Sequence, residues 1–402
     1  MGEETSGAGF SRQERRRASA VAIGAITLEA ALVELIAPLL PQIEQRTGAG
    51  PGALGSALAA YALPVVILSI PLGAAANRIG RRHFLVGGLA LTAVGSLLIG
   101  ASHSIALLLG GRTLQGLGAV ASWIAAMTIV SDLAPPQRRG QALGYALSAV
   151  GIGSLAGPLV GGVGSDLIGF EAPFLIVAMI GALLAGAAAT VRLPLGSGEA
   201  PGGRAVDRLR AALRRAPGLL GATTALVAAG ATGLIEIVVP LDSDARFDLS
   251  AGAIGLLFTG AIAIEAVLAP LGGRWGDRRG RGGPAAAGLA LLAASLLTLA
   301  TLPGLILTAI ALAILGAGLG LTFAAALPWL DEAFGAADRS LAYGALNLVY
   351  AAGYLVGPAL GGLLYGRSGA ALAYLAAAAA VASVAPLILS PRARPNPPPD
   401  RP

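Results

Sequence analysis

The chain has 402 residues, of which 55% are hydrophobic and only 12% are charged, and its mean hydropathy is +0.78. This balance excludes an ordinary soluble globular protein and indicates a chain that crosses a membrane many times. Because the sequence has no cysteine and only two separate histidines, His83 and His103, it also excludes disulfides, thiolate metal sites and a histidine cluster.

The chain begins with a polar segment, residues 1–18, which we interpret as a cytoplasmic tail and not as a cleavable signal. Apolar runs long enough to cross a bilayer, about 20 residues each, then follow in two groups of six. They lie at 19–41, 54–76, 84–101, 105–133, 141–164, 172–193, 219–240, 251–272, 284–302, 304–330, 341–365 and 370–389. The sequence therefore predicts an all-α membrane protein with twelve transmembrane helices.

Arginine orients these spans, because cytoplasmic loops of membrane proteins carry an excess of basic residues. All of the 27 arginines except Arg46, Arg112, Arg246 and Arg367 fall in the two terminal tails or in loops that follow even-numbered spans. We therefore expect both termini in the cytoplasm. The high Ala, Gly and Arg content is typical of a GC-rich bacterium, so the expected location is a bacterial plasma membrane.

The expected domains are two six-helix bundles, at 19–193 and 217–389, joined by a cytoplasmic basic linker at 194–216. Within the linker, apolar residues at helical spacing between Arg204 and Arg215 favour an amphipathic helix on the inner leaflet, with a solvated linker as the alternative. The proline-rich end, 390–402, is expected to be a disordered tail.

The two bundles are internal repeats, because several patterns recur 200 residues apart. GPLVGG (157–162) recurs as GPALGG (357–362), QGLG (115–118) aligns with LGAG (315–318), and the loop at 73–82 aligns with that at 273–282. Two homologous six-helix halves are the plan of a rocking-bundle secondary transporter, with a substrate site between the halves near the middle of the membrane.

Small residues at every fourth position in spans 5 and 11 clear one helix face, so that another backbone can approach closely, and a proline introduces a bend. The expected helix-seam residues are Gly153, Gly157, Pro158 and Gly161, and their equivalents Gly353, Gly357, Pro358 and Gly361.

Three motifs resemble those of the major facilitator superfamily, and in particular its twelve-span drug:proton antiporter branch, which includes multidrug exporters and vesicular amine transporters. The matching residues are Gly73, Asn77, Arg78, Gly80, Arg81 and Arg82 after span 2; Arg112, Gln115, Gly116 and Gly118 in span 4; and Gly153, Gly157, Pro158, Gly161 and Gly162 in span 5. The resemblance covers residues 19–389 and implies the major facilitator fold.

The resemblance also implies a gating role for the loops after spans 2 and 8. The gating residues it implies are Gly73, Asn77, Arg78, Gly80, Arg81, Asp277, Arg278, Gly280 and Arg281. Asn77 stands where the family usually has aspartate, while Asp277 keeps the acid in the second half. The latch that this acid provides on the cytoplasmic side is therefore expected to be weaker in the first half.

Charged side chains at bilayer depth cost roughly 2.5–3.5 kcal/mol, so those present are functional candidates. There are five: Glu29, Glu34, Arg112, Glu236 and Glu265. The patterns ELIAP and EIVVP suggest that Glu34 and Glu236 are equivalent positions facing one cavity. Glu29 lies about 140° around the helix from Glu34, so only one of them can face that cavity fully.

A carboxylate in an apolar cavity can bind either a proton or a cationic substrate, which gives exchange without covalent chemistry. The resemblance adds that antiporters of this branch carry essential acids on span 1, and that the arginine matched by Arg112 takes part in proton coupling. The alternatives are that the glutamates pair with Arg112 or reach an interface, and that Arg112 anchors a helix end. Asp132, Asp331 and Glu332 are shallow and are expected to pair with nearby arginines.

Aromatic residues are few, and the candidates for a stacking surface are Trp123, Tyr145, Phe258, Trp329, Tyr343, Tyr350 and Tyr354. We place Trp123, Asn347 and Tyr350 in the substrate cavity, since an aromatic ring beside a buried acid suits an organic cation. Packing inside the bundle is the alternative role for each.

These features favour a proton-coupled exporter of small lipophilic or cationic compounds. A metabolite or sugar carrier of the same superfamily and a non-transporting receptor or scaffold remain alternatives. The loops are too short for an intramembrane enzyme, and no Walker motif is present, so we expect no cofactor and a proton gradient as the energy source. The expected partners are the lipid bilayer, protons and a small-molecule substrate, with no nucleic acid, for a monomer.

Overall fold

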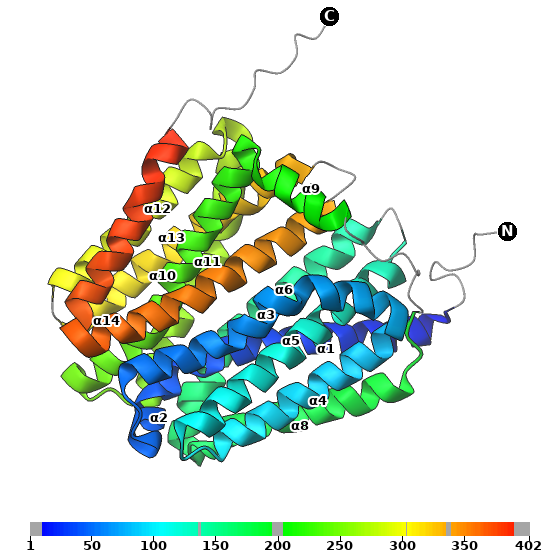
Figure 1. Ribbon diagram of the computed structural model, residues 1–402, viewed down its shortest axis with the longest axis horizontal. Helices are drawn as coiled ribbons and strands as arrows, with labels where there is room; N and C mark the ends of the chain where they lie inside the picture. Colours follow the sequence, from blue (N-terminus) through cyan, green and yellow to red (C-terminus); the bar gives the residue numbers. More distant parts are fainter. Residues whose placement is uncertain (1–9, 136–137, 195–203, 303, 335–338, 390–402) are drawn as a thin grey trace, which may run out of the picture. The chain divides into compact units, whose positions relative to one another are not determined.

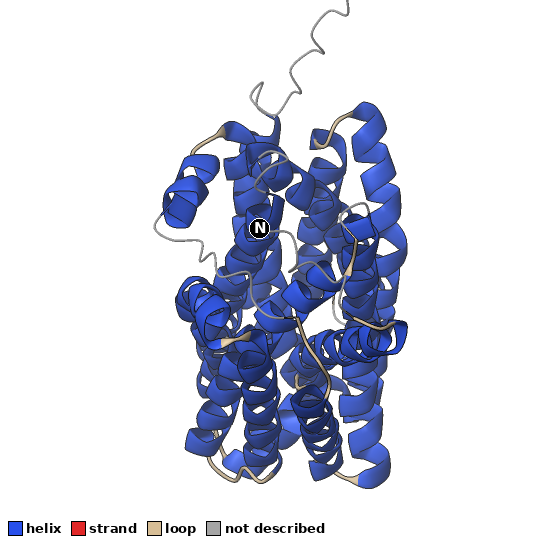
Figure 2. Cartoon of the chain, turned by 90° about the vertical axis from the view of Figure 1, so that its right-hand side faces the viewer, coloured by secondary structure: helices blue, strands red, loops and turns tan. Residues whose placement is uncertain are grey.

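Inside a bilayer no water is present to bond the backbone, so a long apolar segment satisfies its N–H and C=O groups by forming a helix. The computed structural model accordingly consists of helices (Figures 1 and 2). It describes residues 10–135, 138–194, 204–302, 304–334 and 339–389. No strand occurs within these ranges. The expected C-terminal tail at 390–402 lies outside them.

The first repeat contains helices joined by short turns. They are α1 (Arg12–Leu35), η1 (Ala37–Leu39), α2 (Leu40–Thr47), α3 (Pro51–Ile79), α4 (Arg81–Gly100), α5 (Ile105–Leu133), α6 (Arg139–Pro158), η3 (Leu159–Val163), α7 (Gly164–Ile168) and α8 (Glu171–Thr190). Helix α1 begins seven residues before the expected span, because Ser11 and Glu14 form a reciprocal capping box. Part of the expected polar tail is therefore helical.

The linker and the second repeat follow. Their helices are α9 (Arg204–Leu213), α10 (Ala216–Phe247), α11 (Ala251–Arg279), α12 (Gly282–Thr301), α13 (Leu305–Phe334) and α14 (Arg339–Leu389). Helix α14 changes direction at Gly369, whose φ of 80° and ψ of 175° are not helical. It therefore holds two spans.

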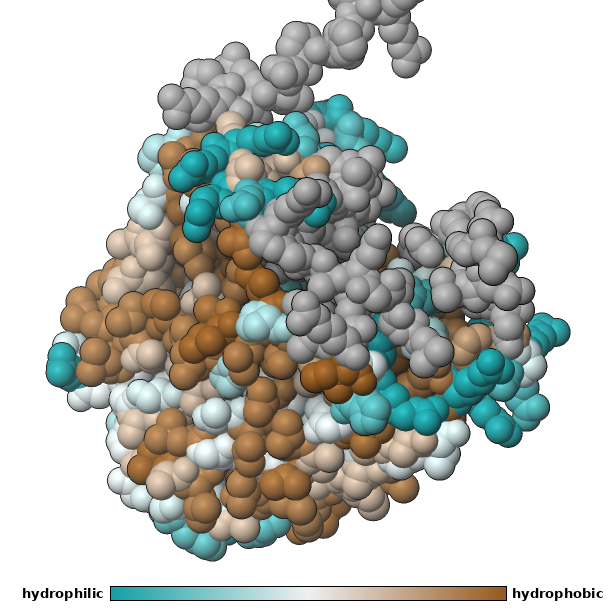
Figure 3. All heavy atoms as spheres, turned by 45° about the vertical axis from the view of Figure 1, so that its right-hand side comes forward, coloured by the Kyte–Doolittle hydropathy of each residue, from teal (hydrophilic) through white to brown (hydrophobic). Residues whose placement is uncertain are grey.

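Eleven described helical segments are long and apolar enough to cross a membrane, and one of them, Ala342–Ile388, has 47 residues. Because that segment bends at Gly369, the expected twelve spans are all present as helices. Figure 3 shows apolar side chains over most of the visible face, with hydrophilic side chains gathered at its margins.

The 200-residue repeat is visible in the helix bounds and turns. Helices α3 and α11 start at residues 51 and 251, α5 and α13 at 105 and 305, and α6 and α14 at 139 and 339. Glycines with positive φ end equivalent segments, at Gly80 and Gly280 and at Gly169 and Gly369. The helix bounds and turns therefore recur at the same 200-residue offset as the sequence motifs.

The chain forms two compact units whose boundaries differ from those of the repeats. The first unit is residues 1–202 with 239–259, and the second is 203–238 with 260–402. The end of α10 and the start of α11 thus belong with the first unit, although the expected division placed them in the second bundle.

The linker helix α9 is present where helical spacing predicts it. It packs on α13 and α14 of its own unit, and Arg215 just after it donates a 2.9 Å hydrogen bond to the carbonyl of Ala333. Ala212 is only 3% exposed. Residues 204–213 of the linker therefore form a helix that packs on its own unit.

Candidate functional site

A buried polar cluster lies inside the first unit, where α1, α4 and α5 meet. The Glu29 carboxylate on α1 accepts hydrogen bonds from the hydroxyls of Thr92 on α4, at 2.9 Å, and Ser122 on α5, at 2.8 Å. Glu29 is 2% exposed. Two hydroxyl donors on neighbouring helices thus compensate part of the desolvation of an acid placed at bilayer depth.

Close approach of α4 and α5 makes this cluster possible. A Cβ added at Gly88 would lie 2.7 Å from the carbonyl oxygen of Gly118, and one at Gly118 would lie 2.5 Å from the Thr92 hydroxyl. Glycine at both positions therefore lets the short side chains of Thr92 and Ser122 reach the same carboxylate.

The second part of the cluster surrounds Arg112, which is completely buried. Its guanidinium donates to Gln115 at 3.1 Å, and Gln115 donates to the Ser96 hydroxyl at 2.9 Å. The guanidinium also lies 4.5 Å from the centre of the Tyr61 ring, within the range of a cation–π interaction. A helix-end anchor would reach water, so burial disfavours that alternative for Arg112.

Tyr61 connects the two parts of the cluster. Its phenol lies within electrostatic range of Glu29, Glu34 and Arg112. Tyr61 and the hydroxyl partners Thr92, Ser96 and Ser122 were not among the expected site residues. In the sequence, these residues are marked only as isolated polar side chains within three otherwise apolar runs.

The second repeat does not keep this cluster. At the equivalent positions it has Ala261 for Tyr61, Leu292 for Thr92, Leu296 for Ser96, Leu312 for Arg112, Leu315 for Gln115 and Thr322 for Ser122. The helix pair has the same close contact in both repeats, since Gly288 meets Gly318 as Gly88 meets Gly118. The polar side chains are therefore not needed to form this helix packing.

Glu34 occupies a different environment from Glu29. It is half-buried, and its Cβ lies 2.8 Å from a Cβ added at Gly157 on α6. The two span 1 acids thus point to different neighbours, as their angular separation on the helix requires.

The helix packing shows that Glu34 and Glu236 are not equivalent positions. In the first repeat Gly153 and Gly157 lie against the carbonyls of Thr27 and Ala31, and in the second Gly353 and Gly357 lie against those of Leu226 and Gly230. This register is 199 residues, so Glu34 corresponds to Gly233. The similarity of ELIAP and EIVVP therefore does not mark equivalent positions. The two segments also differ in structure, since the turn η1 follows Glu34 whereas α10 continues through Pro240.

Glu236 on α10 belongs to a second buried site, inside the second unit. It is 1% exposed and accepts a hydrogen bond from the Tyr354 hydroxyl on α14. The Tyr354 ring stacks on Tyr350 with centroids 6.3 Å apart, and Tyr350 lies 5.8 Å from Phe323 on α13. Phe323 had no signal in the sequence apart from being aromatic.

The remaining cavity candidates are half-buried. Trp123 on α5 and Asn347 and Tyr350 on α14 are partly exposed. Glu265 on α11 is also half-buried, and its backbone carbonyl lies 2.7 Å from a Cβ added at Gly320 on α13. Among the described residues, no group of three or more His, Cys, Asp or Glu could hold a metal ion.

The seam glycines pack helices within each unit. Gly153, Gly157 and Gly161 lie against the backbone of α1, where a Cβ would overlap the carbonyls of Thr27, Ala31 and Leu35. Gly353, Gly357 and Gly361 pack on α10 in the same way. The expected close approach of another backbone is therefore present, and the partner is the first helix of the same repeat.

The two seam prolines differ. Helix α6 ends at Pro158 and continues as the widened turn η3, whereas Pro358 lies inside the continuous α14 and its ring is 2.6 Å from a Cβ added at Gly233. At the position of the expected bend, the structure has a change of hydrogen-bond pattern directly after Pro158.

Ion pairs at equivalent positions tie the gating segments to their own units. Arg81, 3% exposed, pairs with Asp132, and Arg281 donates to Glu332 at 2.6 Å and to the carbonyl of Pro328 at 2.7 Å. Asp132 and Glu332 are thus confirmed as partners of nearby arginines. Asp277 and Arg278 are exposed, and the surroundings of Gly73 and of the Asn77 and Arg78 side chains lie outside the described part of the structure.

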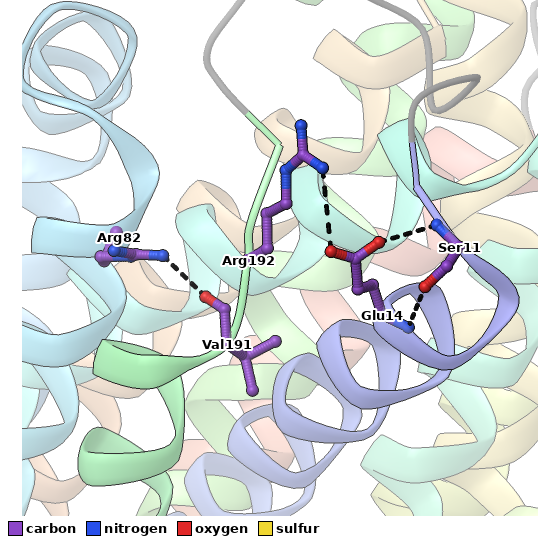
Figure 4. A network of polar contacts seen from close by, with 5 residues as sticks. All are labelled: Ser11, Glu14, Arg82, Val191 and Arg192. Carbon is purple, nitrogen blue, oxygen red and sulfur yellow. Dashed lines mark hydrogen bonds and ion pairs between the residues drawn. The ribbon is translucent and has the colours of Figure 1, made fainter.

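A further network holds the same end of the first unit together (Figure 4). Arg82 donates a 2.7 Å hydrogen bond to the carbonyl of Val191, just after α8. The neighbouring Arg192 pairs with Glu14 at 3.7 Å, and Glu14 accepts from the backbone of Ser11 at 2.8 Å. These exposed contacts link the starts of α1 and α4 to the end of α8.

Comparison with known proteins gives the family. The model described as Major Facilitator Superfamily matches residues 22–243 and again residues 221–402. The inner membrane transport protein YajR of Escherichia coli is 35% identical over 133 residues, which are 33% of this chain and 29% of that protein. The multidrug resistance protein Stp of Mycobacterium tuberculosis is 31% identical over 160 residues, which are 40% of this chain and 29% of that protein. The matched segments thus span less than a third of these relatives.

Solved structures match the chain over nearly its whole length. A bacterial homologue of the human lysosomal transporter Spinster, in an inward-facing and occupied conformation, gives a TM-score of 0.78 at 15% identity, covering 94% of this chain and 97% of that one. The human organic anion transporter MFSD10 gives 0.65 at 19% identity, covering 93% and 99%. At these identities the likeness shows the fold.

Proposed function

Because the chain belongs to the Major Facilitator Superfamily, and is therefore a transporter and not an enzyme, we propose that it exports small lipophilic, cationic organic compounds in exchange for protons. In this proposal it is a monomer in a bacterial plasma membrane with both termini in the cytoplasm. It binds no cofactor and takes its energy from the proton gradient.

The observation that carries the proposal is the buried cluster around Glu29 and Arg112. Buried ionisable groups in a membrane protein are retained for function, because apolar side chains would fold at lower cost. The second repeat demonstrates that alternative in this same chain, with Leu292, Leu312 and Leu315 at equivalent places. A proton-binding role explains why only one repeat keeps the polar set.

The proton site in this proposal is Glu29. Its carboxylate is held by Thr92 and Ser122, and Tyr61 lies within electrostatic range of it and of Arg112. Uptake of a proton by Glu29 removes a negative charge from the buried cluster that also contains the Arg112 cation, so protonation changes the balance of charge between α1 and α5. Such a change can favour one conformation over another.

The substrate class is supported by the second buried site. Tyr350, Tyr354 and Phe323 form a row of aromatic rings next to the Glu236 carboxylate, and aromatic faces and carboxylates both attract organic cations. Relatives named for multidrug resistance and efflux agree with this class. Glu34 and Glu265, both half-buried, are further acids that a cation could approach.

Transport in inside-out vesicles tests the proposal. With an acid interior imposed, we expect accumulation of ethidium that collapses when the pH gradient is dissipated, and release of protons when ethidium is added. Glu29→Gln should abolish proton release, whereas Asp207→Asn, an exposed acid of α9, should leave it unchanged. Full proton coupling in Glu29→Gln would exclude Glu29 as the proton site.

A metabolite or sugar carrier is the second candidate, favoured by Asn77 in the position of the family's usual aspartate and by an aromatic content of only 4%. It predicts no ethidium transport and uptake of a neutral solute in right-side-out vesicles instead.

A further inference from the structure

The geometry points to Asp166 as the latch of an outer gate: its carboxylate caps the start of α11 and holds that side of the transporter closed. This inference rests on the proposed transport function and topology, and it assigns a role to a residue outside every motif of the sequence analysis.

Two hydrogen bonds form the latch. The Asp166 carboxylate on α7 accepts from the Ser250 hydroxyl at 2.6 Å and from the backbone N–H of Gly252 at 2.9 Å. The Ser250 hydroxyl also accepts from the N–H of Ala253 at 3.3 Å. A carboxylate at a helix start satisfies free N–H groups and interacts favourably with the helix dipole.

Backbone contacts next to the latch show that it closes a tight seam. A Cβ added at Gly162 would overlap the carbonyl of Ala251, and one at Gly255 would overlap that of Pro158. A Cβ at Gly252 would lie 2.5 Å from the Asp166 carboxylate itself. Glycine at these positions therefore allows η3 and α11 to meet with nothing between them.

The contact joins the two sequence repeats, since η3 and α7 belong to the first and α11 to the second. The first nine residues of α11 lie in the first compact unit, so the latch and seam are internal to that unit. The opposite repeat has no equivalent, because Gly366 replaces Asp166 and Gly50 replaces Ser250. By the arginine distribution, this end of α11 faces outward.

An alternating-access cycle has to break this contact whenever the outer side opens. Asp166 and Ser250 are both exposed, so the latch adds only a small stabilisation of the closed state to that of the apolar seam. Capping interactions of this kind change an equilibrium by a few-fold. Removing the carboxylate should therefore shift the population toward the outward-open state without unfolding the protein.

Cysteine accessibility tests the latch, because the chain has no cysteine. A single thiol is introduced as Ala251→Cys, 5% exposed, or in a second series as Ile254→Cys, fully buried, and intact cells are treated with a membrane-impermeant maleimide. We expect Asp166→Asn and Asp166→Ala to raise the labelling rate about threefold or more. Asp248→Asn, a neighbouring exposed acid whose positive φ of 51° suits asparagine, should leave the rate unchanged.

The exposed Gln45→Cys, at the end of α2, separates failure of the latch from failure of the topology. If Gln45→Cys is labelled and the Asp166 variants leave both reporters as slow as the parent, the latch is overturned. If Gln45→Cys is not labelled from outside, the proposed topology fails and an outer latch fails with it. Loss of transport in the Asp166 variants without faster labelling would also count against a gating role.

Discussion

At the scale of single residues, a buried carboxylate links neighbouring helices through its hydrogen bonds. Glu29 is bonded by Thr92 and Ser122, and Glu236 is bonded by Tyr354. Each acid thus links two or three helices of its own unit. The two acids differ in their surroundings, because two hydroxyl groups donate to Glu29, whereas Glu236 lies next to a row of aromatic rings.

We expect Glu236→Gln and Tyr354→Phe to destabilise the protein by a similar amount, about 1 kcal/mol each, since both remove or weaken the same buried hydrogen bond. The double variant should lose little more than either single one, because the interaction is shared. Thermal unfolding in detergent measures this. Fully additive losses would show that the two side chains act independently.

At the scale of the element, glycine determines which helices can touch. Helix α6 has glycines on two faces: Gly157 lies against the backbone of α1, while Gly151 has open space around its Cβ position. A larger side chain would therefore clash with α1 at Gly157 but not at Gly151, because the two residues lie on different faces of α6.

Gly157→Leu should abolish transport, because its side chain would have to displace the backbone of α1 next to Ala31. Gly151→Leu, six residues away on the same helix, is the matched control and should transport normally. Vesicle transport per inserted protein measures both. Equal activity of the two variants would contradict a requirement for close α1–α6 packing.

Sequence patterns predict elements more fully than they predict partners. The twelve spans, the 200-residue repeat and the helix in the linker follow from hydropathy and motif spacing, and the structure contains them. The pairing of Glu34 with Glu236 fails because the contacts of α1 and α10 repeat at an offset of 199 residues, whereas the two similar pentapeptides are 202 residues apart. The partners of Glu29 depend on how α1, α4 and α5 are rotated about their axes, which hydropathy does not specify when a run is apolar on all sides.

For the whole molecule, the repeats share a backbone plan and differ in chemistry. Helix starts, positive-φ glycines and the glycine contacts between α4 and α5 recur between α12 and α13. Among the described residues, the cluster of Arg112, Gln115 and Tyr61 lies in the first unit, and the row of aromatic rings beside Glu236 lies in the second. Duplication of one six-helix unit followed by separate specialisation of each copy accounts for this pattern.

The distribution of arginines predicts the orientation of the whole chain in the membrane. All but four of the 27 basic residues lie in the tails or in loops after even-numbered spans, so both termini and the linker with α9 should face the cytoplasm. Reporter fusions after residue 216 and at the C-terminus should give a cytoplasmic signal, and a fusion after residue 302, between α12 and α13, should give an outer one.

Replacing Arg15, Arg16 and Arg17 with glutamine should weaken this preference, because the charges nearest the first span usually dominate orientation. An outer signal from either cytoplasmic fusion of the parent chain would contradict the twelve-span topology, and with it the assignment of Asp166 to the outer side.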